Sequence, residues 1–377
     1  MPQPDAGFYV GLMSGTSVDS IDAVLVRFDP SNDGNPEIIA AEGYPIEDAM
    51  RKAILALCSP GPAELDRSGQ LDRTLGEVFA SAVTRLLESS GVKASQVTAI
   101  GSHGQTVRHR PPGTIATPFS LQIGDPNTIA AMTGITTVAD FRRRDMALGG
   151  QGAPLVPAFH QAVFAAAEDR AVVNVGGMAN ITELSADGSV RGYDTGPGNV
   201  MLDYWIGLQQ GLSYDADGAW GASGRVHPEL MERLMADPYF SAPPPKSTGR
   251  EAFNPAWLET GMSGLSVAAA DVQATLCEVT ATSIAQAVQA FSPGGEVLIC
   301  GGGAHNADLL KRLRRRLPTW SVSTTDQYGI AADWVEAVAF AWLAKQTLAG
   351  LAGNCPGVTG ASEETVLGGI FPAGRAR

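Results

Sequence analysis

The feature that most restricts the fold is a strand–turn–strand pattern near the start of the chain. Residues 8–13 (FYVGLM) and 22–28 (DAVLVRF) are rich in β-branched and aromatic residues, which favour strands. Between them Gly15, Thr16 and Ser17 have small side chains, so backbone amides and hydroxyls are left uncovered for an oxyanion. In P-loop and dinucleotide-binding motifs the glycine turn leads into a helix, whereas this turn leads into a second strand. The pattern therefore predicts a phosphate-binding hairpin, with an ordinary hairpin turn as the structural alternative.

The length and the charge of the chain exclude several classes of protein. Its 377 residues are enough for two domains of about 150 residues each. A net charge of −13 argues against nucleic-acid binding, which requires clustered positive charge. There is no run of the ~20 apolar residues that a membrane span needs, and no basic segment precedes the first apolar strand as in a signal peptide. We therefore expect a soluble, cytoplasmic protein that binds neither nucleic acid nor membranes.

Two further glycine turns follow strands. Strands at 171–175 and 181–184 enclose Gly176 and Gly177, which repeats the opening pattern and indicates an internal duplication of the hairpin. A strand at 297–300 leads instead through the glycines at 301–303 to a helix at 307–317, so that backbone amides and a helix N-terminus face the turn. The basic run at 311–316 is typical of the solvated face of that helix. Helical periodicity also predicts helices at 47–58 and 63–90, the second with an apolar face that includes Leu65.

Polar side chains follow two strands in the first half of the chain. A strand at 97–100 delivers His103, Gln105 and Thr106 in a glycine turn. A histidine in such a turn is more often packed or solvated than a ligand, but its place at the end of a strand favours a function. A strand at 136–139 leads into three arginines, 142–144, between two aspartates. These arginines fit either an exposed ion-pair cluster or the forked binding of a carboxylate or phosphate.

Acidic residues mark two more positions. Asp194 lies between glycines, after a strand and before a helix at 200–209, so it can project into a cleft; capping or turning the chain is the structural alternative. Asp333 and Glu336 have the spacing of a helix N-cap and its reciprocal acid, and structural capping is the favoured interpretation for both.

Taken together, these motifs resemble the anhydro-N-acetylmuramic acid kinase family, of the sugar kinase/Hsp70/actin fold. The matching segments are 11–19 (GLMSGTSVD), 101–106 (GSHGQT), 122–126 (QIGDP), 138–145 (VADFRRRD), 149–155 (GGQGAPL), 194–199 (DTGPGN) and 300–303 (CGGG). The similarity extends from Gly11 to Pro372. One position departs from the family pattern, because Ser20 stands where the family usually has glycine. If that position needs a positive φ, serine would strain it and weaken nucleotide binding.

The resemblance implies an α/β, two-domain sugar kinase/Hsp70/actin-like (ribonuclease H-like) fold with an interdomain cleft. The first domain would take residues 1–140 plus 351–377 and the second residues 141–350. The implied activity uses ATP and Mg²⁺ and acts on 1,6-anhydro-N-acetylmuramic acid. Water opens the anhydro bridge, O6 is phosphorylated, and N-acetylmuramic acid 6-phosphate is formed in cell-wall (murein) recycling. The family is typically homodimeric.

The resemblance also assigns residues to roles. Asp194 is the general base that activates the water. The expected nucleotide-binding residues are Gly15, Thr16, Ser17, Val18, Asp19, Ser20, Ile21, Asp22, Gly176, Gly177, Gly301, Gly302 and Gly303. The expected sugar-binding residues are His103, Gln105, Thr106, Arg142, Arg143 and Glu336. The metal ligands are not identified.

Two other functions fit the same motifs. A levoglucosan kinase acts on an anhydrosugar that lacks the lactyl carboxylate, so an arginine dedicated to a carboxylate would favour the muramic substrate. A non-catalytic ATP-binding regulator or chaperone on the same fold would have no need of an unpaired Asp194 directed into the cleft.

Overall fold

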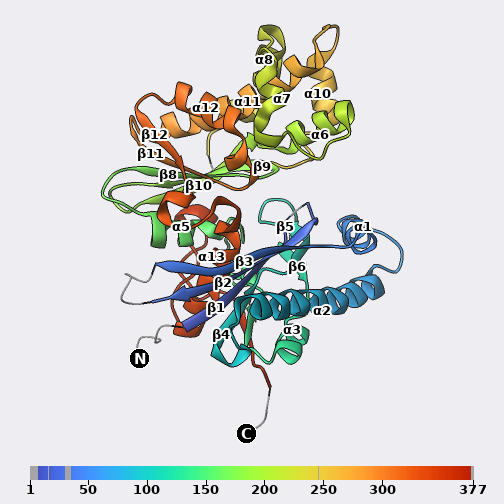
Figure 1. Cartoon of the computed structure of the whole chain (residues 1–377), viewed down its shortest axis with the longest axis vertical. Helices are drawn as coiled ribbons and strands as arrows, with labels where there is room; N and C mark the ends of the chain where they lie inside the picture. The colour runs from blue at the N-terminus through green and yellow to red at the C-terminus, as the bar shows by residue number, and fades with distance from the viewer. Residues whose placement is uncertain (1–6, 16, 30–34, 245, 375–377) are drawn as a thin grey trace. The chain divides into compact units, whose positions relative to one another are not determined.

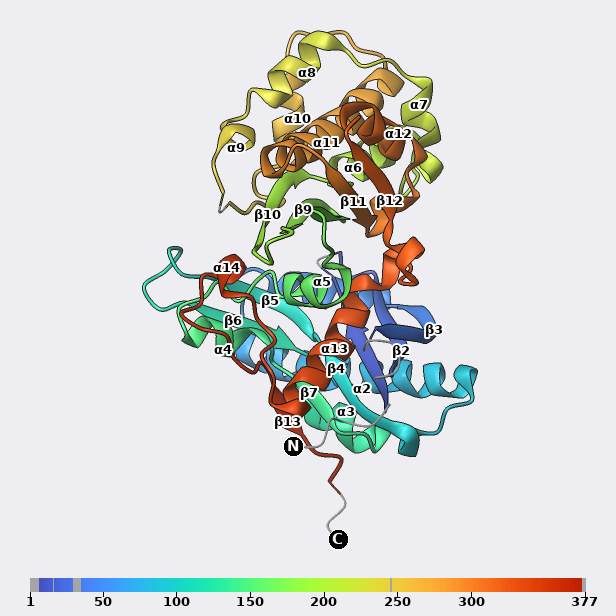
Figure 2. The same ribbon diagram turned by 90° about the vertical axis from the view of Figure 1, so that its left-hand side faces the viewer.

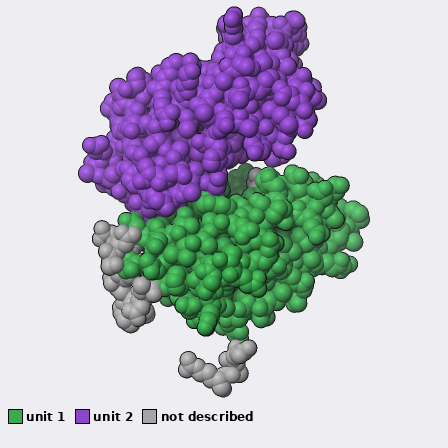
Figure 3. Space-filling view, in the orientation of Figure 1, with its two compact units in different colours: residues 1–159, 334–377 green, residues 160–333 purple. Residues whose placement is uncertain are grey.

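The computed structural model describes residues 7–15, 17–29, 35–244 and 246–374. The chain divides into two compact units, unit 1 with residues 1–159 and 334–377 and unit 2 with residues 160–333 (Figure 3). The expected domain limits assigned residues 141–159 and 334–350 to the second domain, whereas this division places them in unit 1. The reason lies in α13 (Val335–Ala349), which packs on the strands of the unit 1 sheet.

Unit 1 contains a six-stranded sheet in the order β13-β7-β4-β1-β2-β3. Its strands are β1 (Gly7–Met13), β2 (Ser20–Phe28), β3 (Pro36–Pro45), β4 (Val97–Ser102), β7 (Thr137–Ala139) and β13 (Gly369–Phe371). β1 and β2 are antiparallel, with Met13 opposite Asp22, and β1 runs parallel to β4. The hairpin predicted from the start of the sequence is therefore confirmed.

The remaining elements of unit 1 are helices and one small sheet. The helices are α1 (Asp48–Leu57), α2 (Glu64–Ser90), α3 (Pro126–Thr133), α4 (Arg142–Ala147) and α14 (Pro356–Thr359). The small sheet is the antiparallel pair β5 (Gln105–Arg110) and β6 (Phe119–Ile123). Helix α5 (Val156–Phe164) includes residues of both units. Both helices predicted from periodicity are confirmed. The apolar face predicted for α2 is wrong at Leu65, which is 87% exposed, because the first turn of the helix extends past the core.

The two faces of the unit 1 sheet are covered differently. Val10 and Leu12 of β1 belong to a core that includes the α2 side chains Leu75, Phe79 and Val83. α13 lies on the face of the sheet opposite α2 (Figure 1; Figure 2), and Gly11 of β1 and Gly101 of β4 face it. A Cβ at Gly11 would lie 1.8 Å from the Ala337 carbonyl oxygen, and one at Gly101 would lie 1.9 Å from the Phe340 carbonyl oxygen. The helix backbone therefore lies directly on the sheet, which only glycine permits.

Unit 2 contains a five-stranded sheet in the order β10-β9-β8-β11-β12. Its strands are β8 (Arg170–Val175), β9 (Met178–Leu184), β10 (Val190–Pro197), β11 (Gly295–Cys300) and β12 (Trp320–Thr324). The order and the strand directions match β3-β2-β1-β4-β7 of unit 1. The predicted duplication of the hairpin therefore extends to the whole sheet, and the expected two-domain α/β fold of the sugar kinase/Hsp70/actin class is confirmed.

The other regular elements of unit 2 are mostly α-helices. They are α6 (Val200–Gln210), α7 (Ala219–Ser223), α8 (Pro228–Met235), α9 (Pro238–Ser241), α10 (Pro255–Met262), α11 (Ala269–Phe291) and α12 (Ala307–Arg316). α11 packs across β9 and β10, and α12 packs against α11. Among the helices of the described ranges, none is long and apolar enough to cross a membrane.

The basic run on α12 was expected to be a solvated face, and this expectation holds for the exposed Lys311, Arg314 and Arg315 but is wrong for Arg312. Arg312 is buried and donates to Oε2 of the buried Glu278 on α11 at 2.5 Å. Arg315 and Arg316 donate to the same carboxylate. A carboxylate on the neighbouring helix therefore turns three of the basic residues into an ion-pair network between α11 and α12.

Candidate active site

The loop between β1 and β2 supplies the first group of expected nucleotide contacts. A Cβ at Gly15 would meet no atom within 4 Å, so the backbone there is open to a ligand. The buried Gln105 holds the loop through two hydrogen bonds. Its Oε1 accepts from the Ser14 hydroxyl at 2.7 Å, and its Nε2 donates to the Gly15 carbonyl at 3.2 Å. Thr16 lies outside the described residues. Gln105, expected to bind sugar, thus supports the loop between β1 and β2.

The strain expected at Ser20 is not present. Among the described non-glycine residues of this loop, Val18 has the positive φ, 55°, and Ser20 does not. Ser20 is the first residue of β2, and its hydroxyl donates to Oδ1 of Asp22 at 3.0 Å. Ser17 donates to the Asp19 carboxylate, so the hydroxyls and carboxylates of the loop are ordered among themselves.

A second group in unit 1 is built around Arg142. Its Nη1 donates to the Gly152 carbonyl at 2.8 Å, and its Nη2 donates to Nε2 of His103 at 2.7 Å. The His103 ring also lies against Phe340, with centroids 4.8 Å apart. Burial, and then the charge of Arg142, lower the pKa of His103 to about 3, so this histidine is a neutral acceptor. Burial lowers the pKa of Arg142 to about 10, although the nearby Glu336 carboxylate acts to raise it. The guanidinium therefore stays charged at neutral pH.

The other predicted sugar residues divide between this group and the surface. Arg143 is exposed and pairs with Asp140 through two bonds from Nε, at 2.8 and 2.7 Å. The Thr106 hydroxyl accepts from Nε2 of Gln122 at 3.0 Å on the β5–β6 pair. A pocket of about 210 Å³ brings His103 and Arg143 together, but Arg142, Gln105, Thr106 and Glu336 do not line it.

The capping role expected for Asp333 is wrong. The residue before α13 is Trp334, which makes no side-chain cap bond. Asp333 Oδ2 lies 2.7 Å from Nε2 of His305 instead. Glu336 lies in the first turn of α13, where its carboxylate acts on Arg142. Asp333 therefore pairs with His305 and does not cap the helix. For Glu336, the nearby charge of Arg142 is a better explanation than capping.

Asp194 lies within β10, not after a strand as expected, and it is not a helix cap because α6 begins only at Val200. The pairing of β10 with β9 shifts register between Asp194 and Gly196, and this bulge lies directly beside the acid. The carboxylate is largely enclosed: Oδ2 accepts from the Thr248 amide at 3.0 Å. Burial raises the pKa of Asp194 to about 6. The hydrogen bond from Thr248 acts to lower this pKa, and the negative charge of Glu251 acts to raise it.

Sequence reasoning missed the segment that surrounds this acid. The Asp194 amide donates to the Lys246 carbonyl at 3.1 Å, and the Asp194 carbonyl accepts from the Tyr239 hydroxyl at 2.7 Å. Together with Thr248 and Glu251, these residues come from a stretch 45 to 57 positions further along the chain. The run KSTGRE at 246–251 was available in the sequence, but nothing local connects it to β10.

The glycine turn of the second hairpin packs against the start of α6. The Asn199 amide donates to the Gly176 carbonyl at 2.8 Å, and the Gly198 amide donates to the Gly177 carbonyl at 2.9 Å. The nearest atom to a Cβ at Gly177 would be 3.9 Å away, so this turn is open on its outer side. It therefore retains the accessible backbone that was expected of it.

The glycines at 301–303 play two different roles. A Cβ at Gly301, whose φ is 75°, would lie 2.2 Å from Oδ1 of Asn174, and a Cβ at Gly303 would lie 2.3 Å from Cγ1 of Val175. Those two glycines are required by packing against β8. Gly302 instead lines a pocket of about 540 Å³, and a Cβ there would meet no atom closer than 3.6 Å. A 3-10 turn, Gly302–His305, separates β11 from α12, and the Asn306 side chain caps that helix at the Leu309 amide.

The pocket beside Gly302 has a mixed lining that suits a nucleoside. Its walls come from the start of α6, the loop after it and the turn before α12. The lining residues are Asn199, Leu202, Asp203, Tyr214, Asp215, Ala216, Asp217, Gly302, His305 and Asn306. Of the expected nucleotide residues only Gly302 is among them, and the polar groups at Asn199 and Asp203 were not found from sequence.

The family model and the curated relatives agree on one family. The family model described as anhydro-N-acetylmuramic acid kinase matches residues 7–373. A Saccharophagus degradans protein of that name is 53% identical over 367 residues, covering 96% of this chain and 98% of its own length. A Shewanella halifaxensis protein of the same name is 52% identical, with 97% and 99% covered. A solved ROK family glucokinase from Streptomyces griseus, in complex with glucose and AMPPNP, is similar at a TM-score of 0.38 and 14% identity over 90% of this chain and 100% of that chain.

Proposed function

The chain belongs to the anhydro-N-acetylmuramic acid kinase family, and from that premise we propose that it is an ATP-dependent kinase of 1,6-anhydro-N-acetylmuramic acid. Water attacks the anomeric carbon, and the bond from that carbon to O6 breaks. O6 takes the γ-phosphoryl group of ATP, and the products are N-acetylmuramic acid 6-phosphate and ADP. The pathway it serves is the recycling of cell-wall murein.

The observation that carries this proposal is the environment of Asp194. A general base works best when its pKa lies close to the working pH, and burial raises the pKa of Asp194 to about 6. At neutral pH the carboxylate is ionised and still basic enough to accept a proton from water. The Thr248 amide holds Oδ2, while no residue in the described ranges donates to Oδ1. That oxygen is the one we assign to the water.

The glycine turns supply positions for the phosphates and the nucleoside. Phosphoryl transfer depends on positioning and charge stabilisation more than on covalent chemistry. The open backbone at Gly15 suits a phosphate oxygen, and the pocket beside Gly302 suits the nucleoside of ATP. Val18 and Asp19 complete the first loop, and the expected contacts Ser20, Ile21 and Asp22 are the first residues of β2. The Ile21 side chain is buried in the core, so only its backbone could face a nucleotide.

A magnesium ion fits the same loop. Within the described ranges no three His, Cys, Asp or Glu side chains form a metal cluster. Mg²⁺ in kinases needs only one or two protein carboxylates, because phosphate oxygens and water complete its shell. Asp19 of the loop and Asp22 at the start of β2 are the carboxylates that would hold it. When bound, the ion would neutralise charge on the phosphates.

Arg142 is the arginine that best suits the lactyl carboxylate of the sugar. Its guanidinium is half-buried and oriented by Gly152 and His103, whereas Arg143 is exposed and already paired with Asp140. An oriented guanidinium loses little freedom when it binds a carboxylate. Glu336 faces the same cation and would limit which part of the sugar can approach. The cleft between domains, the homodimer and the cytoplasmic location stay predictions.

The test is an ADP-release assay with 1,6-anhydro-N-acetylmuramic acid, levoglucosan and N-acetylglucosamine as acceptors. We expect turnover to be highest on the first. A preference for levoglucosan would favour the levoglucosan kinase, and no turnover on any acceptor, with ATP bound, would favour the regulator. In ¹⁸O-labelled water the label should enter the anomeric hydroxyl and not the phosphate, because O6 itself attacks phosphorus. Label in the phosphate would show that water attacks ATP.

A further inference from the structure

We propose that Tyr239, Lys246 and Thr248 form a clamp that positions Asp194 as the general base, with Tyr239 as its anchor. This inference rests on the proposed function, because it assumes that Asp194 acts on the water. None of the three residues needs to touch substrate. They act through the backbone and one carboxylate oxygen of Asp194, and so they are positioning residues.

The position of Asp194 in the sheet creates the need for a clamp. β10 is the edge strand of the unit 2 sheet, so half of its backbone groups have no strand beside them. At Asp194 both outward groups are nevertheless paired, the amide with the Lys246 carbonyl at 3.1 Å and the carbonyl with the Tyr239 hydroxyl at 2.7 Å. The clamp thus supplies the hydrogen bonds that a neighbouring strand would otherwise make to the Asp194 backbone, and so prevents movement of the base.

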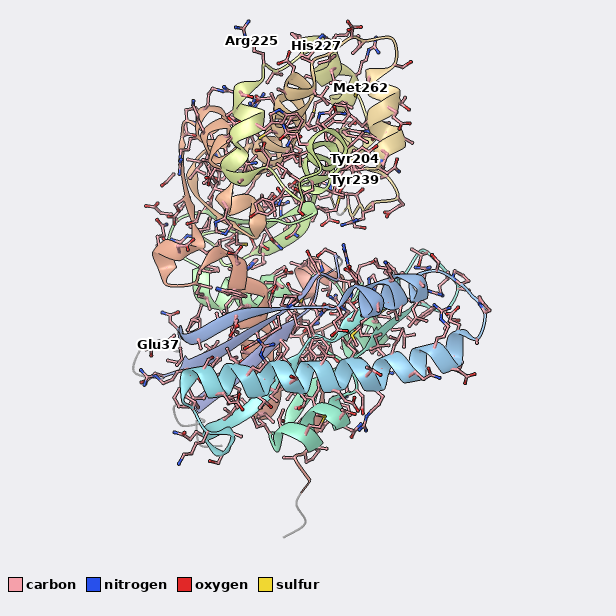
Figure 4. All side chains as sticks on the ribbon, turned by 45° about the vertical axis from the view of Figure 1, so that its right-hand side comes forward. Glu37, Tyr204, Arg225, His227, Tyr239 and Met262 are labelled. Carbon is pink, nitrogen blue, oxygen red and sulfur yellow. The ribbon has the colours of Figure 1, made fainter. Side chains whose placement is uncertain are left out.

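Tyr239 is held rigidly on its own side. Its amide donates to Oδ1 of Asp237, the N-cap of α9, at 2.9 Å. Its ring packs edge-on against the fully buried Phe253, with centroids 5.6 Å apart, and Phe253 packs in turn against Trp257 at 5.1 Å. The Trp257 indole donates back to Asp237 at 3.1 Å. Figure 4 labels Tyr239 in unit 2. Because aromatic contacts hold its ring, the hydroxyl that binds the Asp194 carbonyl has a fixed position.

Lys246 joins the two ends of the clamp. Its ammonium donates to the Tyr239 carbonyl at 3.0 Å and to the Phe240 carbonyl at 3.3 Å, and it lies 4.7 Å from the centre of the Tyr239 ring. Its own carbonyl accepts the Asp194 amide. One residue thus binds both the anchor and the catalytic strand. Two positions later the Thr248 amide binds the carboxylate at 3.0 Å and fixes its rotation.

The bulge in β10 brings the clamp and the strand into close contact. Gly196 has a φ of 149°, and a Cβ there would lie only 2.8 Å from the Phe240 ring. The aromatic segment next to Tyr239 therefore packs directly on the bulged backbone. With one oxygen held by Thr248 and the backbone held on both sides, Oδ1 keeps a fixed direction for a water molecule. A misplacement of about 1 Å in a reacting group costs roughly 10²-fold in rate.

The test compares two tyrosine-to-phenylalanine variants of the full-length protein, both at tyrosines close to Asp194. Tyr239→Phe removes the hydroxyl that binds the Asp194 carbonyl and keeps the ring in its aromatic cluster. We expect kcat to fall roughly 10- to 100-fold, with the Kd for ATP unchanged. The matched control is Tyr193→Phe, in the residue next to Asp194, whose hydroxyl donates to Glu183 at 3.1 Å. This variant should lower thermal stability and leave kcat near that of the wild type.

Lys246→Met gives an independent variant, because it removes the ammonium and keeps the length of the side chain. It should lower kcat in the same way. Hydrogen exchange at the Asp194 amide supplies a readout other than activity, and it should be faster in Tyr239→Phe and Lys246→Met than in Tyr193→Phe. Wild-type kcat and unchanged exchange in a folded Tyr239→Phe protein would overturn the clamp while leaving the proposed function intact. Failure of the function itself is separate, because the wild type would then release no ADP on any anhydrosugar. If Asp194→Asn retained full turnover, Asp194 would not be the base and the clamp would have no role in catalysis.

Discussion

Nη2 of Arg142 donates a 2.7 Å hydrogen bond to Nε2 of His103, a buried imidazole that is neutral because burial and the guanidinium itself lower its pKa to about 3. The histidine therefore orients the arginine without competing for its charge. An arginine fixed in this way has N–H donors in a defined plane, which is the geometry that a carboxylate requires.

The first prediction is that Arg142→Met raises KM for 1,6-anhydro-N-acetylmuramic acid much more than for levoglucosan, which has no carboxylate. A charged hydrogen bond of this kind contributes about 1.5–3 kcal/mol, so we expect roughly a 10- to 100-fold rise. Steady-state kinetics on both sugars measure it. Arg143→Met is the matched control, because Arg143 is exposed and paired with Asp140, and it should change neither KM appreciably. Equal losses on both sugars for Arg142→Met would instead give this arginine a structural or phosphate-binding role.

The second prediction concerns the glycines of the first hairpin. Gly15→Val should leave the fold intact, because a Cβ at Gly15 meets no atom within 4 Å, and should abolish ATP binding by filling the space of the phosphate. Calorimetric titration with ATP and a thermal melt measure the two effects. Gly11→Ala supplies the contrast, since its Cβ would lie 1.8 Å from the Ala337 carbonyl oxygen, and that protein should fail to fold. Normal ATP affinity in folded Gly15→Val would refute the phosphate assignment.

The third prediction is an acid limb in the pH–rate profile near pH 6. The base must be ionised, and the raised pKa of Asp194 means that activity is lost as the pH falls through about 6 and not only near 4. The pKa of His103, about 3, lies too low to add a limb in this range. Glu251→Gln removes a negative charge that raises the pKa of Asp194, so it should move the limb to lower pH. A limb that does not move in this variant would assign the titration to another group.

Asp194→Asn keeps the shape of the side chain and cannot accept the proton. We expect it to fold and to bind ATP and sugar with near-normal affinity. Its turnover should fall by at least ~10²–10⁴-fold, the usual contribution of a general base. Rapid-quench turnover and equilibrium binding separate the two effects. A variant with lower thermal stability and only a modest loss of turnover would indicate a structural acid instead.

The last prediction tests the ion-pair network between α11 and α12. Burial alone would raise the pKa of Glu278, but bonds from Arg312 and Arg316 outweigh it and hold the pKa below its ordinary value of 4.5. Its contribution to stability is therefore complete above about pH 4.5 and is lost as the pH falls through the lowered folded value. Glu278→Gln should cost up to about 3 kcal/mol in urea unfolding at pH 7, because buried Arg312 loses one of its two carboxylate partners and keeps only Asp308. Arg315→Ala, with its side chain 64% exposed, should cost less than about 1 kcal/mol. Similar losses in both variants would contradict this ranking.

The sequence by itself determined the two hairpins, the long helices, the family motifs and the open backbone at Gly15. These features depend on neighbours along the chain, such as the alternation of a strand, the periodicity of a helix or the absence of a side chain. The duplication predicted for the hairpins extends in the structure to the order of the strands in the two sheets.

Only the tertiary structure decided what each polar residue does. Asp194 is enclosed by residues 45 to 57 positions away, Arg312 is buried by a carboxylate on another helix, and Asp333 is paired with His305 and caps nothing. Leu65 is exposed because the core ends before the helix does. Charge and hydrogen-bond partners act over a few ångströms in space whatever their separation in sequence, so local patterns identify an acid or an arginine but not the group that sets its pKa or its direction.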